Sequence, residues 1–377
     1  MPPPTSAASR PASLPGLTGL RGVGAIWVML FHFQQGINVP VLRRGYLGVD
    51  LFFVLSGFIL SHVYGDSLAR PDLASYLTFL KVRLARIYPV HLLTLLVLAL
   101  VVILVPHFTA PYHDPARAFG LPGFVASLFL VQTWGFAPGS MWNGPSWSLS
   151  AEWLAYLVFP FLLVPLGRLV SPWRAALTAV VVLVVLTATL SVLHYREFDA
   201  ATRAGMVRMA AEFTIGCLVY RVFRSGAAIG IGLVTAAWVV LLVVGLAAEP
   251  SLWADCVVVA CFGLTVWLGA QPTGPVGWGL SRAPIVFLGE ISYSLYMTHW
   301  IVLQLANWAA RTARLSPSSL PLRDGVAVAM IFVLSYVCYR YVEMPGRNWG
   351  RRLGGAGRRY LPPAAALAQT GEKVRDT

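Results

Sequence analysis

The chain has 377 residues, of which 57% are hydrophobic and only 11% are charged, against roughly 25% charged residues in soluble domains. This composition excludes a soluble globular protein and indicates a polytopic membrane protein. The net charge of +13 does not indicate nucleic-acid binding, because the basic residues lie in short connectors between apolar runs, where the positive-inside rule places them.

The first sixteen residues are rich in proline and serine and are expected to form a disordered cytoplasmic segment. They are similar to the polar region of a signal peptide. The apolar run that follows has the length of a membrane span and no small-residue cleavage site after it, so we expect it to be retained as a helix.

Ten apolar windows have close to the roughly 20 residues that cross a bilayer. They cover residues 17–36, 46–64, 87–106, 147–167, 174–193, 205–222, 226–248, 251–270, 284–308 and 323–343. A shorter run at residues 124–134, followed by a Gly/Pro-rich segment, predicts a half-helix or re-entrant element. The expected fold is therefore all-α, with one transmembrane domain over residues 17–343.

The distribution of charge predicts the orientation of the domain. A cytoplasmic N terminus places 19 of the 28 lysines and arginines inside and nine outside, as the positive-inside rule requires. Both termini are then cytoplasmic. Residues 344–377 are expected to form a basic, disordered tail that touches anionic lipid.

Arg21 and His32 lie eleven positions apart in the first window. On a helix both side chains point the same way and stand roughly 16 Å apart along the axis. This places Arg21 near one end of the span and His32 well inside the bilayer. Ionisable residues at that depth are costly and are functional candidates. The structural alternative is a buried histidine bonded to a neighbouring helix.

The second window contains the sequence GVDLFFVLSGF at residues 48–58, which includes Asp50. An arginine, ten residues, a histidine and then this segment resemble the opening signature of the bacterial membrane-bound acyltransferase family 3. The resemblance covers roughly residues 17–343. It implies an enzyme of the bacterial inner membrane that moves an acyl group, typically acetyl, from acyl-coenzyme A (acyl-CoA) to a hydroxyl of a carbohydrate.

The resemblance also implies roles for the first two candidates. His32 would be the general base, because imidazole titrates near neutral pH, or it would accept the acyl group covalently. Arg21 would orient or stabilise charge near the thioester. No permanently bound cofactor is expected, and the four cysteines lie in apolar runs without the spacing of a metal site.

Residues 81–89 read KVRLARIYP at the expected cytoplasmic entrance to the third span. Arg83 and Arg86 are neighbours on one helix face, and arginine forks suit phosphate groups. Taken alone, the pair is typical of the basic flank of any span. The resemblance implies that this Arg-x-x-Arg holds the acyl-CoA donor.

Residues 144–160 read GPSWSLSAEWLAYLVFP. Ser148 and Glu152 are four apart, not the three of a capping box, so helix capping does not account for the glutamate. The resemblance implies that Glu152 is an essential carboxylate near the acceptor hydroxyl. The alternative is a buried glutamate that pairs with an arginine.

Residues 287–300 read FLGEISYSLYMTHW. Ser292, Tyr296 and His299 fall within a narrow arc of one helix face, and such a polar stripe is expected to face the bundle interior. With Asp50 and Ser148, these three residues are expected to line the substrate pocket.

Two other functions fit parts of this pattern. A transporter or glycolipid flippase would use buried His, Asp and Glu residues as a proton relay, and another multispan acyltransferase would act on lipid or protein. The Arg-x-x-Arg and the lack of repeat symmetry argue against transport. The acceptor, the acyl group, the side of transfer and the oligomeric state stay open.

The predicted topology can be tested with reporter fusions. Cytoplasmic reporters fused at Arg70 and Arg282, and periplasmic reporters fused at Asp199 and Ser316, should be active because of the 19 to 9 charge split. An active cytoplasmic reporter at Asp199 would contradict the orientation.

Overall fold

The computed structural model describes residues 13–33, 39–70, 72–136, 139, 142–196, 198, 203–227 and 229–353. These residues form helices and connecting turns, and no strand occurs among them. Seven of the described helices are long and apolar enough to cross a membrane by length and composition. The all-α, polytopic fold is therefore confirmed, while the number of spans and the side of the termini stay predictions.

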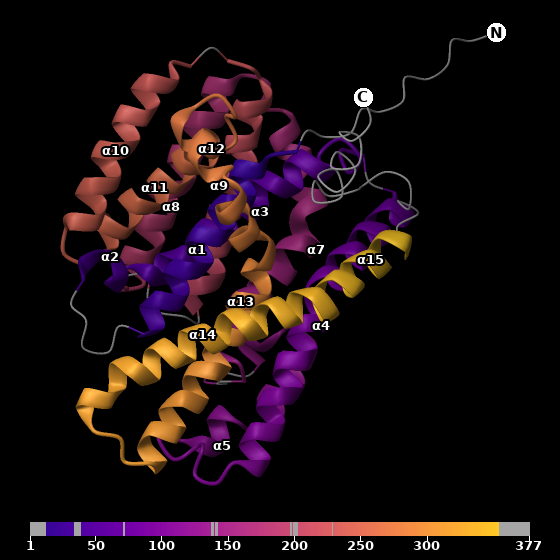
Figure 1. Cartoon of the computed structure of the whole chain (residues 1–377). Coiled ribbons are helices and arrows are strands. Elements are labelled where there is room, and N and C mark those ends of the chain that lie inside the picture. The colour runs from indigo at the N-terminus through magenta and orange to yellow at the C-terminus, as the bar shows by residue number, and fades with distance from the viewer. Residues whose placement is uncertain are drawn as a thin grey trace, which may run out of the picture.

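Each of the ten apolar windows corresponds to a described helix (Figure 1). These are α1 (Pro15–Phe33), α3 (Gly48–Tyr64), α4 (Leu73–Leu104), α7 (Trp147–Gly167), α8 (Pro172–Val192), α9 (Arg203–Arg224), α10 (Ile231–Ala247), α11 (Leu252–Gly269), α13 (Ala283–Thr312) and α14 (Leu320–Cys338). Shorter elements connect them: α2 (Pro40–Arg43), η1 (Gly45–Leu47), α5 (Pro115–Ala118), α6 (Leu121–Leu128), η2 (Gln132–Phe136), η3 (Gly144–Ser146), α12 (Pro275–Leu280), η4 (Pro317–Ser319), η5 (Tyr339–Glu343) and α15 (Met344–Leu353).

Helix α4 is much longer than its apolar window. It begins at Leu73 because Asp72 caps it, with the carboxylate accepting the backbone N–H of Ser75 at 2.7 Å. Arg83 and Arg86 therefore lie within a continuous 32-residue helix, and their place at the cytoplasmic entrance to the span stays a prediction. In the region of the predicted half-helix, α6 has only eight residues, and its re-entrant character stays a prediction.

Glycines bring α1 and α13 into backbone contact. A Cβ atom added at Gly289 would lie 1.8 Å from the carbonyl oxygen of Thr18, and one at Gly22 would lie 2.6 Å from the nitrogen of Gly289. Gly57 and Gly216 have the same effect between α3 and α9. Small residues let helix backbones approach closely in membrane proteins, so these positions fix the two helix pairs side by side.

The segment predicted to be a loose tail is partly helical. Residues 344–353 form α15, which lies against α4 (Figure 1). A Cβ atom at Gly346 would be 2.7 Å from Cγ of Pro89, and one at Gly350 would be 2.6 Å from Cβ of Ala85. Disorder is therefore the wrong prediction for these ten residues, because their glycines allow close packing. Residues 1–12 and 354–377, also predicted to be disordered, lie outside the described residues.

The contact between α1 and α13 leads to a stability prediction. Gly289→Ala should destabilise the protein by about 1–3 kcal/mol, since the new methyl group would overlap backbone that has no room to move. The midpoint of thermal unfolding in detergent should fall. Gly279→Ala in α12, where an added Cβ meets nothing within 4 Å, is the matched control and should leave the midpoint unchanged.

Candidate active site

Arg21 and His32 both contact α13, as their shared helix face predicted. Nη2 of Arg21 donates to the carbonyl oxygen of Gly289 at 2.6 Å and to Oγ of Ser292 at 3.2 Å, and His32 meets His299. Along α1, which runs from Pro15 to Phe33, His32 lies in the last turn and Arg21 lies about two turns from the start. Their depth in the bilayer stays a prediction.

The hydrogen bonds of the two histidines define their tautomers. Nδ1 of His32 lies 2.8 Å from the carbonyl oxygen of Val28, and Nδ1 of His299 lies 3.2 Å from that of Leu295. Because a carbonyl only accepts, both Nδ1 atoms carry hydrogen. Nε2 of His299 is then an acceptor and faces Nδ1 of His32 at 3.4 Å. Nε2 of His32 keeps its lone pair.

A polar stripe on α13 connects Arg21 to His32. Ser292 accepts from Arg21, the Tyr296 hydroxyl lies 2.8 Å from Oγ of Ser148, and His299 meets His32. Ser292, Tyr296 and His299 are all buried. The expectation that this stripe faces the bundle interior therefore agrees with the structure, and it brings Ser148 to the same place.

Glu152 lies away from the two histidines. Its Oε1 accepts from Oγ of Ser56 at 2.8 Å and from the Tyr156 hydroxyl, and lies 3.9 Å from Nη2 of Arg83. Arg83 also donates to the Tyr156 hydroxyl. These contacts match the alternative of a glutamate that pairs with an arginine. Within the described residues, no contact joins Glu152 to His32.

Four arginines from three helices gather here: Arg21, Arg83, Arg86 and Arg347. Arg21 and Arg86 each interact electrostatically with the other three arginines. Two carboxylates lie among them, since Glu152 pairs with Arg83 and Glu343 pairs with Arg347. Four positive and two negative charges leave a net charge of +2 among them. We call these six residues the arginine cluster.

Sequence reasoning missed Arg347 and Glu343. Glu343 is fully buried, and it accepts from Oγ of Ser294 at 2.7 Å and from Nη1 of Arg347 at 3.4 Å. The available signal was an acidic residue at the end of an apolar window with an arginine four positions later, which is a helical ion-pair spacing.

Asp50 lies in a separate charged cluster. Its carboxylate accepts from Nε of Arg208 at 2.8 Å and from Nη2 at 2.5 Å, and both side chains are almost completely buried. A second buried pair, Arg44 with Asp255 at 3.1 Å, lies nearby. The structure therefore places Asp50 in a buried ion pair, not beside the α13 stripe.

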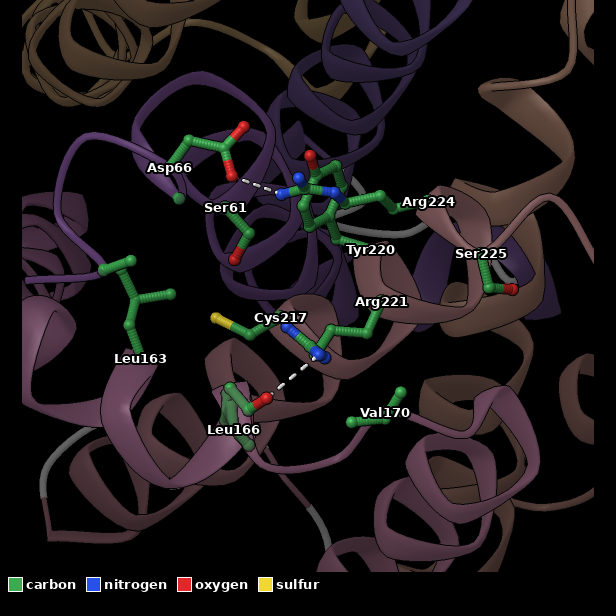
Figure 2. Close-up of a pocket in the computed structure, with 13 residues that line it drawn as sticks. Ser61, Asp66, Leu163, Leu166, Val170, Cys217, Tyr220, Arg221, Arg224 and Ser225 are labelled. Carbon is green, nitrogen blue, oxygen red and sulfur yellow. Dashed lines mark hydrogen bonds and ion pairs between the residues drawn. The ribbon is translucent and has the colours of Figure 1, made fainter.

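A cavity of about 450 Å³ lies at the ends of α3, α7 and α9 (Figure 2). Its polar lining includes Ser61, Asp66, Arg221 and Arg224. Arg224 pairs with Asp66 at 2.5 Å, and Arg221 donates to backbone carbonyl groups. None of the predicted site residues lines this cavity.

Comparison with known families identifies the bundle that holds this site. A family model described as an acyltransferase domain matches residues 14–340. The chain belongs to acyltransferase family 3. As a member of that family it is a transferase, as the opening signature indicated, and it is a multi-pass membrane protein.

Two relatives of this acyltransferase illustrate the family. The acyltransferase MdmB of Streptomyces mycarofaciens is 31% identical over 333 residues, which are 79% of this chain and 81% of MdmB. The O-acetyltransferase OatA of Staphylococcus aureus is 23% identical over 370 residues, 90% of this chain but only 58% of OatA. The chain thus spans a little more than half of OatA. No solved structure matches it.

The two clusters predict different responses to the loss of a carboxylate. Asp50→Asn should cost about 3–5 kcal/mol of stability, because it removes the close carboxylate partner of a buried arginine and leaves only Glu212, 4.0 Å away. Asp66→Asn, which removes a largely exposed partner of Arg224, should cost less than about 1 kcal/mol. Chemical denaturation in mixed micelles measures both. Equal stabilities would show that the Asp50 pair contributes little.

Proposed function

We propose that this acyltransferase moves an acetyl group from acetyl-CoA to a hydroxyl of a carbohydrate at the bacterial inner membrane. The observation that carries the proposal is the polar stripe on α13, which connects the arginine cluster to the His32–His299 pair. The proposal adds a donor and an acceptor to the family's acyl-transfer activity.

The dimensions of the stripe suit a CoA thioester. Arg21 and His32 are separated by roughly 16 Å along α1, and CoA carries its phosphates and its thioester at opposite ends of an extended pantetheine arm. The net positive charge of the arginine cluster suits the phosphates. The thioester would then lie near His32, with Ser292 and Tyr296 along the arm.

The tautomer of His32 defines its chemistry. Its Nε2 lone pair would take the proton of the acceptor hydroxyl as the oxygen attacks the thioester carbonyl carbon. The resulting imidazolium keeps its Nδ1–H bond to the Val28 carbonyl, with the Nε2 acceptor of His299 3.4 Å from the same nitrogen. When the C–S bond breaks, the proton passes from Nε2 to the thiolate. The products are an ester and CoA, with no net change in protons.

The position of His32 in α1 also supports an exported acceptor. In the predicted orientation the last turn of α1 faces away from the cytoplasm, and the arginine cluster lies toward it. A glycan hydroxyl would approach from the outer side and the donor from the inner side. Transfer through an acetyl-His32 intermediate would use the same Nε2 atom.

Acetyl transfer from radiolabelled acetyl-CoA by the purified protein tests this proposal. His32→Gln should lower the rate by about 10² to 10⁴, since it removes the base. His299→Gln should lower it by at most about tenfold, because it perturbs one hydrogen bond worth about 0.5–1.5 kcal/mol.

His194→Gln is the control, because His194 is an exposed residue outside the site. It should leave the rate unchanged. A His32→Gln enzyme with near-normal turnover would overturn the role of His32 as the base. His32 would then be a buried histidine that only bonds to a neighbouring helix.

A further inference from the structure

The two arginines of the Arg-x-x-Arg have different surroundings. Arg83 is 8% exposed; it donates to the Tyr156 hydroxyl, lies 4.4 Å from the centre of that ring and pairs with Glu152. Arg86 is more exposed and makes no hydrogen bond or ion pair within the described residues. Arg83 is therefore held by protein groups, and the guanidinium of Arg86 is available to a ligand.

Helix α15 brings a second guanidinium to Arg86. The glycine contacts of Gly346 and Gly350 place α15 directly on the turn of α4 between Ala85 and Pro89. Arg347 follows Gly346 and interacts electrostatically with Arg86. Like charges that approach in a poorly solvated region repel each other, so an anion between them would be strongly favoured.

The turn that precedes α15 fixes the position of Arg347. At η5 the helix widens to a π-helix over Tyr339–Glu343, a feature that is frequent at functional sites. Glu343 is anchored by Oγ of Ser294 at 2.7 Å, and its other oxygen accepts from Arg347 at 3.4 Å. Glu343 is thus a positioning residue that ties α15 to α13.

We propose that Arg86 and Arg347 form a diphosphate-binding site, in which Arg83 takes no direct part and instead positions Glu152 and Tyr156. Two guanidinium forks without a full complement of carboxylates match two adjacent phosphate groups in charge and in hydrogen-bonding geometry. Arg21, held on α13 by Gly289 and Ser292, adds a third positive charge nearby. Only the naming of CoA as the source of the diphosphate rests on the proposed function.

Calorimetric titration of the purified full chain in nanodiscs with inorganic pyrophosphate tests the site itself. Arg86→Gln and Arg347→Gln should each weaken binding by about tenfold to a hundredfold, as expected for charge-assisted contacts. Arg83→Gln should bind pyrophosphate like wild type. Arg352→Gln, an exposed residue on the same helix as Arg347, is the matched control and should also bind normally.

The folded state of each variant is checked by gel filtration and thermal unfolding. Arg347→Lys, which keeps the charge, should retain more affinity than Arg347→Gln. Wild type that does not bind pyrophosphate, or Arg86→Gln and Arg347→Gln variants that bind it normally, would overturn the site. So would an Arg83→Gln variant that is folded but loses pyrophosphate binding.

A second titration separates this site from the proposed donor. Dephospho-CoA keeps the diphosphate, and pantetheine lacks it. If the diphosphate belongs to CoA, Arg86→Gln and Arg347→Gln should weaken dephospho-CoA binding but not pantetheine binding. Pyrophosphate binding that depends on both arginines, without any CoA binding, would support the site and overturn CoA as the donor. CoA binding that depends on neither arginine would show that CoA places its diphosphate elsewhere and would overturn CoA as the ligand of this site.

Discussion

The backbone contact between α1 and α13 is the constraint on which the site depends. Gly22 and Gly289 let the two helices approach until side chains on facing turns meet directly. Arg21 donates to the carbonyl oxygen of Gly289 on α13, and His32 contacts His299 at the other end of the same interface. One helix pair therefore carries both the charged end and the imidazole end of the proposed path.

Two sets of charged side chains in the bundle differ in their balance of charge. In the first set Asp50 is closely paired with Arg208, and both side chains are buried between helices, so this pair holds the helices together. The buried Glu212 lies 4.0 Å from Nε of Arg208, so the set has no excess of positive charge. The arginine cluster has more positive than negative charge and partial exposure at Arg86 and Arg347. An unbalanced cluster is costly unless an anion joins it, so the arginine cluster suits an anionic ligand.

Local patterns predicted the helices and the faces of single helices, and contacts between distant residues were not predictable. Hydropathy located every long helix, and the 3.6-residue period placed Tyr296 and His299 on one buried face. The sequence could not show that Asp50 meets Arg208, 158 positions away. It also missed Arg347, because the packing of α15 depends on tertiary contacts with α4.

The wide turn at η5 makes the phase of α15 depend on chain length. A π turn holds one residue more than an α turn, and each residue of an α-helix advances the side chains by about 100°. Closing η5 into an ordinary α turn by removing one residue would rotate α15 by roughly that angle relative to α14. Arg347 would then turn away from Arg86 although the residue and its helix were unchanged. The number of residues in the segment 339–343 therefore matters to the site as much as the identity of Arg347.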